Sequence, residues 1–191
     1  MNVCFSGLGG QGIALLGLAL GEAAARSGLN ALQTQSYGAE ARGGASYSTV
    51  IISKERILDI APEELDMLVA MSQPAYDRFR KGLKGDGVLV YESDLVKPAD
   101  AGGAEDRCDC PRSSAPRRPS VAGGAGIPAT SLARKNLGKE LFANMVMFGF
   151  FVRVSRVVDA GKAREAIAAS VPAKTVESNL KAFELGFDCT P

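Results

Sequence analysis

Histidine is absent from this sequence of 191 residues, and cysteine is scarce. Without histidine, the chain cannot build a Ser-His or Cys-His nucleophile or a metal site with imidazole ligands. Its four cysteines form no Cys-x-x-Cys pair, so the pattern indicates neither an iron–sulfur cluster nor a structural zinc site. We therefore expect no metal on this chain. The cysteines are Cys4, Cys108, Cys110 and Cys189.

An excess of charge and a long apolar run are also missing. The chain has 22 basic and 21 acidic residues, a net charge of +1, so nothing favours nucleic acid or an anionic membrane surface as a partner. The longest apolar run, 141–152, is interrupted by Asn144, whereas a membrane-spanning helix needs about 20 apolar residues. The first residues do not resemble a secretion signal. We expect a cytoplasmic protein.

Hydrophobic patterning predicts alternating strands and helices, followed by helices alone. The expected strands span 3–5, 31–34, 45–53, 67–71 and 87–91. The expected helices span 13–26, 73–83, 131–136, 141–158, 161–170 and 173–186. Gly28 is expected to end the first helix, and Ser131 to cap the third, at 131–136.

The order of these elements predicts the fold class. It favours an α/β fold, namely a three-layer α/β/α domain with a mixed, mostly parallel sheet and a helical C-terminal cover. Because only about ten loop-like residues separate the second and third strands, that pair should be antiparallel or not adjacent. The length suits a single domain over residues 1–191.

Residues 97–126 depart from this pattern. Up to residue 120 this segment has no Val, Ile, Leu, Met or aromatic residue. Such a composition cannot bury enough apolar surface to offset the entropy of ordering the chain. We expect an atypical, flexible segment, and two explanations stay open: a surface insertion or a shifted reading frame in the gene.

A glycine-rich turn between the first strand and the first helix is the first candidate site. Glycines allow positive φ angles and close approach of a ligand, and the first amides of a helix have no intrahelical partner. The turn therefore predicts a binding site for a phosphate or carboxylate. Its candidate residues are Gly7, Gly9, Gly10, Gln11 and Gly12.

Two familiar glycine motifs fit this sequence less well. The Gly-x-Gly-x-x-Gly spacing occurs in dinucleotide sites, but such a site needs an acidic residue at the end of the second strand. Here residues 32–35 carry no acid, and the first one is Glu40. The triplet Gly85-Asp86-Gly87 has the letters of a thiamine diphosphate motif. However, it precedes a strand and lacks the later Asn pair, so we expect a turn there.

A second small-residue loop follows the second expected strand. Its Arg42 offers a planar fork for a carboxylate or phosphate, which Glu40 or Tyr37 would position. The alternative is a solvated loop with an incidental ion pair. The candidate binding residues of this loop are Ser36, Tyr37, Gly38, Glu40, Arg42, Gly43 and Gly44.

Taken together, the two loops resemble the gamma subunit of the 2-oxoacid:ferredoxin oxidoreductases. The resemblance covers about residues 2–98 and 126–187, and the sequence departs from the family at 99–125. The stretches that carry it are 7–13, 33–46, 66–73, 87–94, 127–130 and 144–149.

The resemblance implies a subunit of a complex that oxidatively decarboxylates a 2-oxoacid to acyl-CoA and passes the electrons to ferredoxin. It implies thiamine diphosphate and magnesium on alpha and beta subunits, and iron–sulfur clusters on a ferredoxin-like delta subunit. This chain would then bind no cofactor alone. Its loops would face the active site, where contact with coenzyme A is one role for them.

Several points stay open at the level of sequence. No catalytic residue is assigned, the 2-oxoacid is not identified, and the isolated chain could be a monomer or a homodimer. Two alternatives to the subunit interpretation remain, namely a free-standing dinucleotide-binding oxidoreductase and a purely structural assembly subunit.

Overall fold

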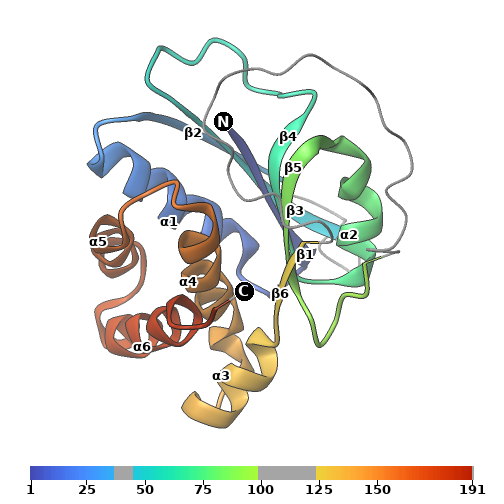
Figure 1. Cartoon of the computed structure of the whole chain (residues 1–191). Coiled ribbons are helices and arrows are strands. Elements are labelled where there is room, and N and C mark those ends of the chain that lie inside the picture. The colour runs from blue at the N-terminus through green and yellow to red at the C-terminus, as the bar shows by residue number, and fades with distance from the viewer. Residues whose placement is uncertain (37–44, 99–123, 191) are drawn as a thin grey trace.

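The computed structural model describes residues 1–36, 45–98 and 124–190 (Figure 1). These residues form a six-stranded sheet with the strand order β2-β3-β1-β4-β5-β6. β1, β4, β5 and β6 run parallel to one another, whereas β3 is antiparallel to both β1 and β2. The strands are β1 (Asn2–Leu8), β2 (Asn30–Gln35), β3 (Ala45–Ser53), β4 (Leu65–Ala70), β5 (Leu83–Glu92) and β6 (Ala125–Ile127).

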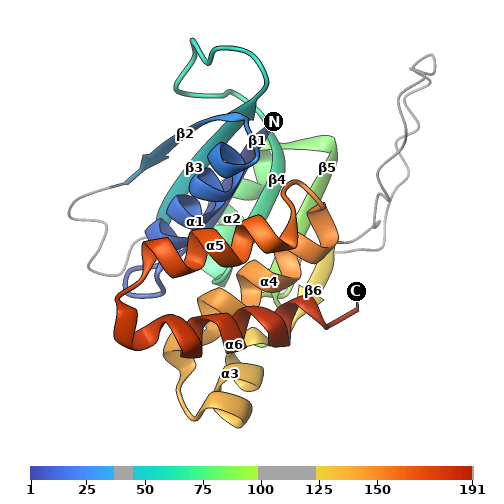
Figure 2. The same ribbon diagram turned by 90° about the vertical axis from the view of Figure 1, so that its left-hand side faces the viewer.

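Helices cover the two faces of the sheet unequally. α1 packs on β1, β2 and β3, and α4 packs beside it near β5 and β6, while α5 covers α1 and α6 covers α4 (Figure 2). The opposite face carries α2. The helices are α1 (Ile13–Arg26), α2 (Gln73–Phe79), α3 (Ala129–Leu137), α4 (Ala143–Ser155), α5 (Ala160–Ser170) and α6 (Val176–Phe187).

The alternation of side chains along each strand divides the core into two clusters. On β1, Val3 and Phe5 point into the large cluster under α1 and α4, where Phe148 and Phe151 surround Phe5. Cys4 points the other way, into a smaller cluster beneath α2. The predicted three-layer arrangement with a mixed sheet and a helical C-terminal cover is confirmed.

Two local predictions are also confirmed. The helix at 13–26 forms with the predicted bounds, and Gly28 ends it with φ 76°. The Gly28 and Leu29 amides donate to the Ala25 and Ala24 carbonyls, the hydrogen-bond pattern of a Schellman motif. β2 and β3 are adjacent and antiparallel, as their short connection requires.

Tertiary contacts override other local predictions. The Gly85-Asp86-Gly87 triplet is not a turn, because β5 already begins at Leu83 and runs through it. α2 ends at Phe79 and is followed by a 3₁₀ turn, Arg80–Gly82. α4 is shorter than predicted, because Glu140–Phe142 forms a 3₁₀ turn before it and Arg156 adopts a left-handed conformation after it.

The prediction that Ser131 caps a helix is wrong. α3 begins two residues earlier, and Ser131 lies within its first turn. An acceptor outside the helix serves its first turn instead: the Ser131 amide donates a hydrogen bond to Asp94 Oδ2 at 3.0 Å. Within the described helices, none combines the length and the apolar character needed to cross a bilayer. The core of the atypical segment, 99–123, lies outside the described residues, and β6 begins just after it.

Candidate functional site

The glycine-rich turn lies at the carboxyl ends of the parallel strands, where α/β sheets commonly bind ligands. The Gln11 amide donates to the Leu8 carbonyl at 3.2 Å, which closes a turn over Gly9 and Gly10. Gly10 has φ 90°, and Gly12, the N-cap of α1, has φ 71°. Side chains disfavour both conformations, so the turn depends on glycine at these two positions.

The side chain of Gln11 locks the turn to the neighbouring strand. Its Oε1 accepts from the Leu8 amide at 2.6 Å, and its Nε2 donates to the Met71 carbonyl at 3.0 Å. Gly7, on β1, leaves room for this arrangement, since a Cβ there would lie 2.5 Å from Gln11 Oε1. Gln11 therefore fixes the turn and is not a free ligand-binding group.

A cavity of about 320 Å³ opens beside the turn. Gly10 and Gln11 border it on one side, and the first turn of α4 borders it on the other. Asn144, buried in that first turn, lines the cavity and packs its amide nitrogen against Gly12. No atom of the described residues lies within 4 Å of the Cβ position of Gly10, and these residues leave its backbone accessible. The remaining lining residues are Met71, Leu95, Thr130, Arg134, Glu140, Leu141 and Ala143.

Two helix N-termini meet at this edge of the sheet, and they differ electrostatically. Glu92, at the end of β5, accepts from the Thr130 amide at 2.9 Å, and Asp94 accepts from the next amide of α3. Two carboxylates of this chain thus accept hydrogen bonds from the free backbone amides at the start of α3. α1 has no side-chain cap at Gly12. Of these two helix starts, that of α1 is therefore the one that the described side chains leave open to an outside anion.

The carboxyl group of Glu92 is buried, and burial raises its pKa. Hydrogen bonds from the Asp94 and Thr130 amides act in the opposite direction but do not cancel this effect. The Glu92 carboxylate caps the start of α3 and is not among the residues that line the cavity. Its contribution to this region is therefore to hold α3 in place.

The cationic side chain at the cavity is already paired. Arg134 Nε donates to Glu140 Oε1 at 2.9 Å, and both side chains are exposed at the rim. An anion in the cavity would compete with Glu140 for this guanidinium. Backbone amides and the Asn144 amide are thus the donors nearest the turn.

The second loop starts and ends next to the glycine-rich turn. Ala45, the first residue of β3, pairs with Leu8. Ser36, at the other end, donates its amide to the Tyr47 carbonyl at 3.1 Å, and its Oγ accepts from the Tyr47 amide. The fold therefore brings the ends of both predicted loops to one edge of the sheet. The other predicted residues, Tyr37, Gly38, Glu40, Arg42, Gly43 and Gly44, lie outside the described residues.

The sheet order argues against a dinucleotide site of the Rossmann type. In that fold the second strand lies parallel to the first and beside it. Here β3 separates β2 from β1, and β2 runs antiparallel to β3. Gln33, near the expected position of the acid, donates to Ala14 O and to Ser48 Oγ, both at 2.9 Å.

Sequence reasoning overlooked Asn144 and Glu92 as parts of this region. Both carry a signal that could have been used. Asn144 interrupts an otherwise apolar run, and Glu92 follows a buried strand directly, where polar groups often serve a site. Their long-range partners, Gly12 and Thr130, could not be read from the sequence.

Comparisons with known proteins agree with this architecture. The family described as pyruvate ferredoxin/flavodoxin oxidoreductase matches residues 2–189. The 2-oxoglutarate synthase subunit KorC of Methanocaldococcus jannaschii is 40% identical over 189 residues, which cover 98% of this chain and 92% of KorC. A crystal structure of a keto/oxoacid ferredoxin oxidoreductase gamma subunit from Geobacter sulfurreducens has 37% identity and a TM-score of 0.77. It covers 98% of this chain and 96% of that one.

A longer relative has a different chain organisation. The ketoisovalerate oxidoreductase subunit VorA of Methanothermobacter thermautotrophicus is 32% identical over 193 residues. The match covers 97% of this chain but only 35% of VorA. The domain described here thus corresponds to one part of a larger polypeptide in that protein.

Proposed function

This chain belongs to the pyruvate ferredoxin/flavodoxin oxidoreductase family, and from that premise we propose that it is the gamma subunit of a 2-oxoacid:ferredoxin oxidoreductase. The complex would oxidatively decarboxylate a 2-oxoacid to acyl-CoA and pass the electrons to ferredoxin. The observation that carries the proposal is a similarity to KorC that extends over nearly the full length of both chains. The shared fold of the Geobacter gamma subunit supports it.

The first substrate to test is 2-oxoglutarate. KorC of M. jannaschii is named as a subunit of 2-oxoglutarate synthase and is 40% identical to this chain, whereas the ketoisovalerate subunit VorA is 32% identical. Ketoisovalerate is therefore the second substrate to test, with pyruvate and aryl pyruvates after it.

The cofactors of the reaction would lie on partner polypeptides. Thiamine diphosphate with magnesium would belong to alpha and beta subunits, and iron–sulfur clusters to a ferredoxin-like delta subunit. The sequence of this chain has no Cys-x-x-Cys pair of the kind that iron–sulfur sites use. We place the complex in the cytoplasm.

This chain would contribute an anion-binding turn to the coenzyme A site. Three features support that role: the uncapped N-terminus of α1, the open space at Gly10, and the adjoining cavity of about 320 Å³. Backbone amides at a helix start suit a phosphate group of coenzyme A. The Asn144 amide would add a donor, and Arg42, from the sequence, is a further proposed phosphate contact.

The test is co-purification of the tagged chain from its native host under anaerobic conditions. Viologen reduction is then assayed with each 2-oxoacid, with and without coenzyme A. We expect larger subunits and iron–sulfur absorbance to accompany the chain, and dye reduction to require both substrates. A chain that emerges alone and colourless would contradict the proposal. A complex that forms normally, with unchanged turnover in Arg42→Ala and Glu40→Ala, would instead favour a purely structural subunit.

A further inference from the structure

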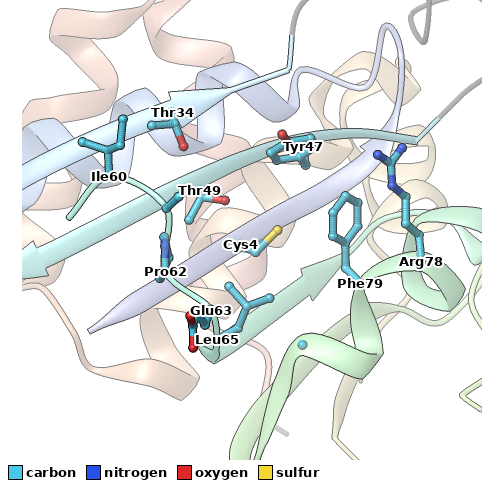
Figure 3. A pocket seen from close by; sticks show the side chains of 12 residues that line it. Cys4, Thr34, Tyr47, Thr49, Ile60, Pro62, Glu63, Leu65, Arg78 and Phe79 are labelled. Carbon is cyan, nitrogen blue, oxygen red and sulfur yellow. The ribbon is translucent and has the colours of Figure 1, made fainter.

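The described residues cover only part of the sheet face opposite α1 and α4. α2 lies over β1, β3 and β4, and a cavity of about 530 Å³ remains beside it, over β1, β2 and β3. Figure 3 shows its walls: Thr34 and Thr49 come from the sheet, Phe79 from α2, and Ile60 and Pro62 from the β3–β4 connection. We call this region the open face.

Large apolar side chains extend the open face beyond its cavity. In the β3–β4 connection, Leu58 is 84% exposed and Ile60 is 61% exposed. Leu58 also borders a second hollow of about 520 Å³ on the other side of this connection, which includes Ile57 and Ile51. A single exposed aliphatic side chain is ordinary, but Leu58 and Ile60 place two of them on one loop, each beside a hollow, with Asp59 between them.

The chemistry of the open face suits apolar side chains better than a polar metabolite. The rings of Tyr47 and Phe79 pack against each other at the cavity in a tilted arrangement, with centroids 5.1 Å apart. Burial raises the pKa of the Cys4 thiol to about 12, so this group is neutral. Among the described lining residues, no buried polar side-chain atom lacks a hydrogen-bond partner. Small-molecule sites usually offer converging polar groups for orientation.

The chain organisation of VorA identifies the occupant. There the region equivalent to this chain makes up 35% of the polypeptide, so a larger segment is covalently attached to it. KorC of M. jannaschii, in contrast, is matched over 92% of its length, so in a chain organised like KorC the surfaces shared with such a segment are exposed until a partner binds. We propose that the open face is the docking surface for a separate partner subunit, the counterpart of the remaining VorA polypeptide. This inference rests on the proposed function.

Apolar side chains of that subunit would enter the cavity between Phe79 and Ile60, and Leu58 would lie against its surface. The anchors of a protein interface are typically large side chains in such pockets, surrounded by a polar rim. Glu63 and Arg78 provide charged groups at the edge of the cavity.

The test uses Leu58→Glu and Ile60→Glu in the chain purified with its partners. Both side chains are exposed, so the isolated variants should melt within about 2 °C of the wild type. We expect the amount of co-purified partner to fall about tenfold or more for each variant. The matched control is Leu18→Glu on α1, which is 47% exposed on the opposite side of the sheet and should co-purify normally.

A photo-crosslinking residue in place of Ile60 identifies the occupant directly. We expect a crosslink to the subunit that corresponds to the remaining VorA polypeptide. If both glutamate variants retain the wild-type amount of partner, or if the crosslink joins two copies of this chain, the inference is overturned while the proposed function stands. If the wild-type chain captures no partner, the proposed function itself fails.

Discussion

At the residue scale, the candidate site depends on contacts between side chains and glycine backbone. Gln11 holds the turn to β4, and Asn144 packs on Gly12 from α4. The turn therefore keeps its shape without a ligand. A ligand that binds to a preformed site does not have to order it, so the entropic cost of binding is lower. The rigidity of the turn therefore favours anion binding.

Asn144→Asp tests the proposed role of the turn. The Asn144 Oδ1 atom accepts from the Met145 amide, which aspartate can reproduce, so the fold should persist. The new negative charge beside Gly12 should repel a phosphate. We expect the KM for coenzyme A to rise about tenfold, or about 1.4 kcal/mol, with the KM for the 2-oxoacid unchanged. Steady-state kinetics of the complex measure both constants.

Asn136→Asp on α3 is the matched control, because Asn136 is exposed and does not line the cavity. Equal KM values for coenzyme A in the two variants would count against an anion at the turn.

The buried Glu92 carboxyl predicts a pH dependence of stability. Burial raises its folded-state pKa above the ordinary value of 4.5. At pH values between 4.5, the pKa in the unfolded chain, and the raised pKa of the folded protein, the folded protein holds a proton that the unfolded chain has released. Raising the pH through this interval should therefore destabilise the wild type relative to Glu92→Gln, which does not titrate. Urea unfolding of both proteins from pH 4 to pH 7 measures the difference, and a constant difference would contradict the prediction.

At the element scale, the C-terminal helices pack through glycine. Gly149 on α4 faces the Phe183 carbonyl of α6, and Gly186 on α6 faces the Val146 carbonyl of α4. A methyl group at either position would collide with backbone, which cannot move aside as a flexible side chain can. These two glycines let the helices that cover the sheet approach closely.

Gly186→Ala should therefore destabilise the protein, although alanine favours helix formation. We expect a net loss of about 2 kcal/mol in the free energy of unfolding, since overpacking outweighs the gain in helix propensity. Gly21→Ala on α1 is the control, because no atom of the described residues lies within 4 Å of its Cβ position, and it should stabilise by about 0.5–1 kcal/mol. Chemical denaturation measures both, and a stabilised Gly186→Ala variant would show that α4 and α6 can separate at little cost.

At the scale of the whole molecule, the strand order decides which ligands the glycine-rich turn can accept. β3 separates β2 from β1, so the described residues hold no second parallel strand on that side of β1, where a Rossmann site carries its ribose-binding acid. The two loops of the candidate site nevertheless meet, because β3 begins beside the end of β1.

Without that ribose contact, the isolated chain should show no binding of NAD⁺ by calorimetry at concentrations up to about 1 mM. A Kd of about 1 mM corresponds to a binding free energy of only about 4 kcal/mol. Wild-type protein in the same buffer without nucleotide gives the baseline. Micromolar affinity for NAD⁺ would instead support the free-standing oxidoreductase alternative.

The sequence by itself determined the features that local chemistry controls. The bounds of α1, its end at Gly28 and the strand at β3 follow from glycine positions and β-branched residues. The short connection between β2 and β3 left only an antiparallel pair or separated strands, and the structure has the antiparallel pair. The family followed from two loop motifs, whose unusual glycine content is legible without coordinates.

Only the tertiary structure decided which distant residues meet. The pairing of Asn144 with Gly12, the capping of α3 by Glu92 and Asp94, and the passage of β5 through a glycine triplet all depend on packing between elements far apart in sequence. The open face was equally hidden, because exposure of Leu58 and Ile60 depends on which helices cover the sheet. Local sequence restricts backbone angles, whereas contacts across the sheet are fixed only when the whole chain has packed.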